Sequence, residues 1–162
     1  MNRLDSTEYE YHVADEKDID AIMSLWNESR LYHAELDSRL SMVDDAHLKA
    51  REYYASQVAS EDTIFYIASR RGVPLGYICA QIQKAPPVHK IQRFGLIDGL
   101  FVTDEFRRLG IGTNLVNLAM EWFEEQELSM IQLSVASMNE TGIQFWERSG
   151  FTEIMRRMRK QM

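Results

Sequence analysis

The sequence is poor in cysteine, in long apolar runs and in positive charge. Cys79 is the only cysteine among 162 residues, so no intrachain disulfide can form. No apolar run approaches the length needed to cross a bilayer. The opening stretch MNRLDSTEYEY has no apolar segment, which indicates no secretory signal. We therefore expect a cytoplasmic protein that has no membrane partner.

The charge balance also excludes some partners. The formal net charge is −7, whereas a protein that binds nucleic acid usually presents a basic face. An acidic chain is compatible with an amine substrate, but net charge informs solubility more than function. The histidines are scattered, and their spacing indicates no metal site. They are His12, His33, His47 and His89.

The pattern of apolar residues predicts one domain over residues 1–162, with strands and helices in mixed order. The expected strands are 9–14, 95–102 and 130–136, and the runs 63–72 and 73–83 are expected to form a hairpin. Residues 151–160 are either a further strand or a frayed tail. The expected helices are 14–29, 44–62, 113–126 and 139–150, with 29–40 ambiguous between helix and loop. This order predicts an α/β fold with a mixed, mostly antiparallel sheet flanked by helices.

The stretch FVTDEFRRLGIGTNL (101–115) places two arginines and two glycines where a strand becomes a helix. A helix N-terminus exposes unpaired N–H groups and a partial positive charge, and glycine lets a ligand approach the backbone closely. The stretch is therefore either an anion cradle for a phosphate or a simple tight turn. It lacks the third glycine of a dinucleotide fingerprint and the lysine of a Walker loop.

The surrounding residues resemble a known family. RRLGIG fits the pattern Arg/Gln-x-x-Gly-x-Gly/Ala, and IDGLFVTDEFRRLGIGTNLV (97–116) resembles motif A of the GNAT superfamily of acyl-CoA N-acyltransferases. SVASMNETGIQFWERSGF (134–151) resembles that family's motif B, and ADEKDIDAIMSLW (14–26) resembles its first helix. The resemblance implies a sheet whose two central parallel strands are splayed apart, with acetyl-CoA as co-substrate and no metal.

The resemblance also implies the residues that bind CoA. The pyrophosphate would lie on the glycine turn, formed by Arg107, Arg108, Leu109, Gly110, Ile111, Gly112 and Thr113. The pantetheine arm would pair with Leu100, Phe101 and Val102 of the preceding strand. Asn139 would reach the cofactor by a side-chain hydrogen bond, and Gly142 and Phe145 would line its path. Gly99, just before Leu100, suits either a β-bulge or a close approach of the ligand to the backbone.

Two residues are candidates for the chemistry. Asp98 interrupts an apolar strand, and some family members carry a carboxylate there, so Asp98 is either the general base or a satisfied structural aspartate. In an extended strand residues 98, 100 and 102 share one face and 97, 99 and 101 the other. Trp146 occupies the position of the family's tyrosine acid, but an indole is no practical proton source. It either lines the sulfur pocket or packs in the core.

The acceptor side is less well defined by the sequence. The resemblance assigns acceptor specificity to residues 30–37 and 86–94, where Tyr32, His33 and Glu35 either bind an amine or form a solvated helix end. The leading hypothesis is acetyl transfer to the primary amine of a small molecule by direct attack in a ternary complex. The alternatives are a protein N-terminal or lysine acetyltransferase, a non-catalytic acyl-CoA sensor and a purely structural module. A homodimer is common in the family.

Overall fold

The computed structural model describes residues 9–162, so the expectation of no secretory signal, which is based on residues 1–11, falls mostly outside the described residues. The elements follow in the order β1 (Glu10–Val13), α1 (Ile19–Leu36), α2 (Ala46–Val58), β2 (Thr63–Arg70), β3 (Val73–Lys84), β4 (Arg93–Val102), α3 (Ile111–Glu125), β5 (Ile131–Leu133) and α4 (Glu140–Arg148). Short 3₁₀ turns precede α1 at Glu16–Asp18, follow it at Ser38–Leu40 and precede α3 at Asp104–Phe106.

The described strands form one open sheet in the order β1-β2-β3-β4-β5. The pairs from β1 to β4 are antiparallel, and β4 pairs with β5 in parallel. The hairpin β2–β3 and the crossover from β4 through α3 to β5 produce this arrangement, because a parallel partner requires a long connection. The predicted mixed, mostly antiparallel sheet is confirmed.

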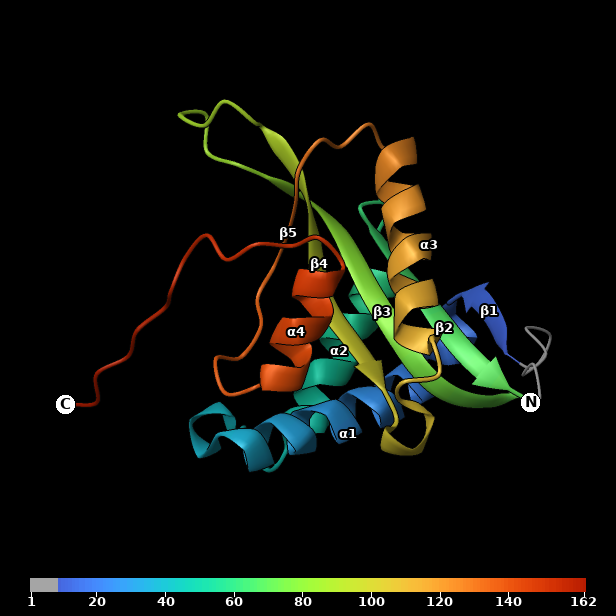
Figure 1. The fold of residues 1–162 in the computed structure, drawn as a ribbon. Helices are drawn as coiled ribbons and strands as arrows, with labels where there is room; N and C mark the ends of the chain where they lie inside the picture. Colours follow the sequence, from blue (N-terminus) through green and yellow to red (C-terminus); the bar gives the residue numbers. More distant parts are fainter. Residues whose placement is uncertain (1–8) are drawn as a thin grey trace.

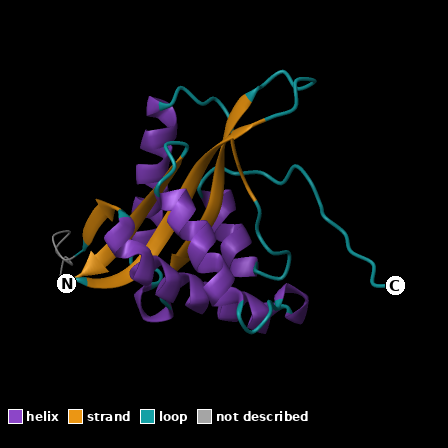
Figure 2. Ribbon diagram, turned by 180° about the vertical axis from the view of Figure 1, so that it is seen from behind, coloured by secondary structure: helices purple, strands orange, loops and turns teal. Residues whose placement is uncertain are grey.

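Helices cover both faces of the sheet (Figures 1 and 2). The core on one face joins α1 and α2 to the sheet and includes Ile22, Leu25 and Phe65. The core on the other face is built on α3, whose buried stripe includes Leu115 and Phe123. This stripe recurs at helical spacing, as the sequence indicates. Of the helices in the described residues, none is both long and apolar enough to cross a membrane.

Three expectations about single segments change. The ambiguous segment 29–40 continues α1 to Leu36 and then forms a 3₁₀ turn. The strand expected at 130–136 shortens to three residues, Ile131–Leu133. The strand option for 151–160 is wrong, since these residues have no secondary structure and Ile154 and Met158 are exposed. This segment lacks the cross-strand neighbours that would bury its apolar side chains.

Candidate active site

The sheet opens between β4 and β5. The two strands pair only from Gly95↔Ile131 to Ile97↔Leu133, whereas β4 continues to Val102. The other edge of β4 remains paired with β3 up to Val102. Beyond Ile97, the backbone groups of β4 on its β5 side therefore have no partner strand among the described residues. This is the splay of the central strands that the family resemblance implies.

Asp98 lies at a β-bulge where the splay begins. Cys79 pairs with Gly99 and Ala80 pairs with Ile97, so Asp98 is the extra residue on β4. The bulge resets the alternation of side chains. Ile97 packs in the α3 core together with Leu100 and Val102, whereas Phe101 packs in the α1/α2 core. The expectation that residues 97 and 101 share a face is therefore wrong, although the bulge predicted beside Gly99 is confirmed.

The carboxylate of Asp98 combines solvent access with partial burial. It forms no side-chain hydrogen bond or ion pair with the residues that the structure describes, and part of its surface is exposed. Burial of its remaining surface raises the pKa of Asp98 above its ordinary value. Burial and then the charge of Asp98 raise the pKa of Tyr54, which places this carboxylate near the α1/α2 face. Such a group accepts a proton more readily than an ordinary aspartate.

The connection from β4 to α3 presents a row of backbone N–H groups. Gly110 is the N-cap of α3 with a φ of 86°, and Arg108 has a φ of 62°. The chain curls here through left-handed conformations that glycine adopts at little cost. The N–H groups of residues 108–113 have no hydrogen-bond acceptor among the described residues, whereas Asn114 N–H already bonds to Gly110 O. Together with the dipole of α3, these amides form a site suited to an anion.

Arg107 has a different place from Arg108. Its Nε donates to Val102 O at 2.9 Å, and its guanidinium carbon lies 4.5 Å from the ring centre of Tyr32 and 5.3 Å from that of Phe101. The backbone N–H of Arg107 donates to the backbone carbonyl of Asp104 at 3.2 Å. The side chain therefore fastens the end of β4 to α1, while Arg108 and Leu109 are exposed beside the free amides.

α4 borders the opening on the α3 side, across from α1. A Cβ added at Gly112 would meet the Phe145 ring at 3.6 Å, so α4 packs against the first turn of α3. Trp146 packs edge-on against Phe145 and Phe151, with ring centres 5.0 and 5.3 Å apart. Its indole is half-buried in the α3 core, so the tryptophan has a packing role here.

Asn139 caps the N-terminus of α4. Its Oδ1 accepts from Gly142 N–H at 3.0 Å and from the Tyr32 hydroxyl at 3.4 Å. A Cβ at position 142 would lie 2.5 Å from Asn139 Nδ2, so a larger residue there would make the Asn139 amide group shift. The asparagine thus joins α4 to α1 across the opening.

We expect Asn139→Ala to lower the free energy of unfolding by about 1 kcal/mol, because the orphan amide of Gly142 loses its acceptor. Asn139→Asp is the matched control, since its carboxylate accepts the same hydrogen bond near the positive end of the helix dipole. Urea denaturation of the two variants checks this. Equal losses in both would contradict a capping role.

The structure brings only part of the expected acceptor site together. Tyr32 reaches the opening, whereas Glu35 is exposed on α1 and the Nδ1 atom of His33 lies 2.7 Å from the Ser29 carbonyl of the same helix. The expected second segment, 86–94, forms the end of the β3–β4 arm. Figure 1 places this arm at the opposite end of the molecule from α1. The two segments therefore do not share one pocket.

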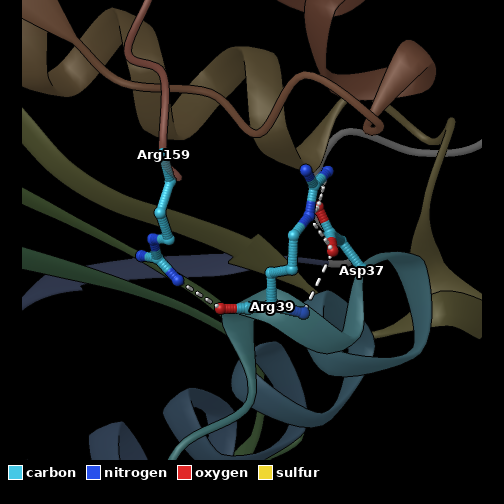
Figure 3. A network of polar contacts seen from close by, with 3 residues as sticks. All are labelled: Asp37, Arg39 and Arg159. Atoms are coloured by element: carbon cyan, nitrogen blue, oxygen red, sulfur yellow. Dashed lines mark hydrogen bonds and ion pairs between the residues drawn. The ribbon is translucent and has the colours of Figure 1, made fainter. Parts of the chain in front are cut away.

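The end of α1 is held by a small polar network (Figure 3). Asp37 accepts from Arg39 Nε and Nη2, and Arg159 donates to the Arg39 carbonyl at 3.1 Å. The hydrogen bonds from Arg39 lower the pKa of Asp37 below its ordinary value. These groups are exposed, and such ion pairs contribute little to stability. The network nevertheless links the C-terminal segment to the turn after α1.

Comparison with known proteins identifies the family. The family model described as "Acetyltransferase (GNAT) family" matches residues 8–151. The chain therefore belongs to the GNAT acetyltransferase family, as the residues of the glycine turn and of α4 indicate.

Two curated relatives are named N-acetyltransferases. An uncharacterized N-acetyltransferase of Methanocaldococcus jannaschii is 29% identical over 104 residues, which cover 64% of this chain and 46% of that protein. An N-alpha-acetyltransferase of Sulfurisphaera tokodaii is 24% identical over 107 residues, which cover 63% of this chain and 64% of that protein. The chain thus covers less than two thirds of either relative.

Solved structures share the fold. A predicted acetyltransferase of Clostridium acetobutylicum with acetyl-CoA has a TM-score of 0.78 at 18% identity, with 94% of this chain and 96% of that chain covered. An aminoglycoside N-acetyltransferase in complex with CoA has a TM-score of 0.71 at 18% identity, with 95% and 94% covered. At these identities the likeness shows the fold alone.

Proposed function

We propose that the protein transfers an acetyl group from acetyl-CoA to the primary amine of a small molecule, by direct attack within a ternary complex. The observation that carries this proposal is the position of the free amides 108–113 at the mouth of the opening between β4 and β5. A diphosphate fits this helix N-terminus, and an extended arm fits the unpaired edge of β4. The GNAT family and the structure that holds acetyl-CoA support the same donor.

Asp98 is the base in this proposal. An alkylamine is mostly protonated at neutral pH, so it must lose a proton before it attacks. Asp98, directly or through a water molecule, takes that proton, and the neutral nitrogen then forms a bond to the thioester carbonyl carbon. An N–H group on the open edge of β4 stabilises the oxyanion.

The leaving group needs no acid from the protein. When the carbon–sulfur bond breaks, the sulfur departs with the electron pair as a thiolate. The nitrogen of the adduct, which became positively charged when it attacked, gives its second proton to solvent water, so the amide is neutral. Thiols have pKa values near 8 to 9, so a proton from water completes the products without help from Trp146. The proton on Asp98 returns to solvent, and the products are an amide and free CoA thiol.

The acceptor side favours a small amine over a peptide. The ring of Tyr32, held by the Arg107 guanidinium 4.5 Å from its centre, extends from α1 towards the start of α4 and narrows the opening on the α1 side. A capped pocket suits a small ligand, whereas a peptide needs an open groove. One structural neighbour is an aminoglycoside N-acetyltransferase, which is consistent with this class. The relative named N-alpha-acetyltransferase keeps a peptide acceptor as the second candidate. The cytoplasmic location and the homodimer stay predictions.

The testing experiment measures thiol released from acetyl-CoA with polyamines, amino-acid derivatives, aminoglycosides and peptides as acceptors. We expect release that depends on one class of small amine. Release only with peptides would favour the second candidate. No release together with a stabilising shift by CoA would indicate a sensor. At about 100 times its Kd, CoA should raise the melting temperature by about 5 to 10 °C. Absence of any shift would contradict the proposal as a whole.

A further inference from the structure

Tyr32 is the residue of α1 that reaches the opening between β4 and β5. Its hydroxyl lies 3.4 Å from Asn139 Oδ1 at the start of α4, while its ring packs against the α1/α2 core. α1 and α4 cover opposite faces of the sheet (Figure 1). The contact between them is possible because β4 and β5 have separated at this level.

Arg107 fixes the ring of Tyr32. The guanidinium carbon lies 4.5 Å from the ring centre, and its Nε is bonded to the last carbonyl of β4. A cation over an aromatic face is attracted by the ring, most strongly where water is excluded. The Tyr32 side chain is thus held between the glycine turn and the cap of α4. Its position is independent of the hydrogen bond that its hydroxyl makes.

The hydrogen bond itself is weak and exchangeable. Its length of 3.4 Å exceeds the usual range of 2.5–3.0 Å for bonds between hydroxyl and oxygen. Asn139 Oδ1 already accepts from Gly142 N–H. Asn139 Nδ2 donates to no group among residues 9–162, and the Tyr32 hydroxyl accepts from none of them. The pair therefore offers a donor and an acceptor to a ligand in the opening.

We propose that Tyr32 binds the amide-bearing arm of acyl-CoA, its hydroxyl exchanging Asn139 for an amide of that arm. This inference rests on the proposed function, because it assigns a further contact of the same donor. An arm that runs along β4 from the amides 108–113 must pass this contact. Its amides carry the N–H and C=O groups that complement Tyr32 and Asn139. Tyr32 thereby connects α1 to the bound acyl-CoA and does not contact the acceptor amine.

The exchange also predicts an order of binding. When the arm bonds to Tyr32, the C-terminal half of α1 gains a second anchor next to Arg107. The part of α1 that borders the acceptor amine therefore reaches its final position only after acyl-CoA has bound. We expect hydrogen exchange of residues 29–36 to slow when CoA binds to the wild-type protein, and to remain unchanged with adenosine 3′,5′-bisphosphate, which lacks the arm.

The mutational test is Tyr32→Phe, which keeps the ring under Arg107 and removes only the hydroxyl. The Kd for CoA should rise about 5- to 10-fold, as expected for the loss of one hydrogen bond. The Kd for adenosine 3′,5′-bisphosphate should stay within about twofold of the wild type. Tyr66→Phe is the matched control, since the Tyr66 hydroxyl on β2 bonds to no described residue and lies on the α3 face. It should change neither constant.

The outcomes separate this inference from the proposed function. An unchanged Kd for CoA in Tyr32→Phe, or an equal loss for both ligands, would overturn the role of Tyr32 while leaving the donor in place. A wild-type protein that binds neither ligand would instead overturn the proposed function. Should Tyr32→Phe not fold, the hydrogen-exchange comparison on the wild type decides, and equal protection by the two ligands would contradict the inference.

Discussion

Replacement of Gly110 by tryptophan is expected to abolish CoA binding while the protein stays folded. A Cβ at this position meets nothing within 4 Å, so the indole would occupy the open space at the N-terminus of α3. The ligand's diphosphate would have to share that space. We expect the Kd for CoA to rise at least about 100-fold, as calorimetric titration would show.

The same change also strains the backbone, because Gly110 has a φ of 86° and the left-handed region costs other residues about 1–2 kcal/mol. Gly72→Trp is the matched control. Gly72 has a φ of 75°, also faces open space, and lies at the turn of the β2–β3 hairpin. Its variant should lose similar stability and keep CoA binding. Equal losses of binding in the two variants would show that the effect is strain and not obstruction.

Asp98→Asn is expected to reduce kcat about 100-fold, the lower end of the contribution of a general base. The amide cannot take the proton from the amine, whereas the amides 108–113 and the edge of β4 are untouched. The Kd for CoA should therefore stay the same. Steady-state kinetics with an active acceptor measure the loss of kcat, and a CoA titration measures the unchanged Kd. Undiminished kcat would remove Asp98 from the mechanism.

The pH dependence of Asp98 follows from its raised pKa. The folded protein binds this proton more tightly than the unfolded chain, whose aspartate has the ordinary value of 3.8. Ionisation at neutral pH therefore costs stability, and this cost disappears as the pH falls through the raised pKa towards 3.8. We expect Asp98→Asn to melt at a higher temperature than the wild type at neutral pH. The wild-type kcat/KM should rise with pH through the same range, because Asp98 must be ionised to act as a base. The kcat/KM of Asp98→Asn should not show this rise.

Much of the fold could be predicted from local patterns. The stripe of Leu115 and Phe123 on α3 and the glycines at 110 and 112 reflect interactions within one segment. The position of the glycine turn between β4 and α3 could be predicted for the same reason. Such features depend on the helical period and on backbone conformation, which a single sequence displays.

The parts that could not be predicted depend on contacts between distant segments. The bulge at Asp98 changes which side chains of β4 face α3, and it is defined only by the register with β3. Arg107 carries the charge expected of a phosphate ligand, but Tyr32 and Phe101 determine where its guanidinium lies. The joining of Tyr32 to Asn139 spans 107 positions of the chain. No sequence spacing indicates such a contact.

The central claim is that the amides at the N-terminus of α3 bind the diphosphate of CoA at the mouth of the opening between β4 and β5. The most direct measurement is a titration of the ¹⁵N-labelled protein with CoA, followed by the amide resonances. The account predicts that the largest shifts fall on residues 108–113, with further shifts along residues 98–102. Saturable binding of CoA that leaves residues 108–113 unperturbed would contradict it.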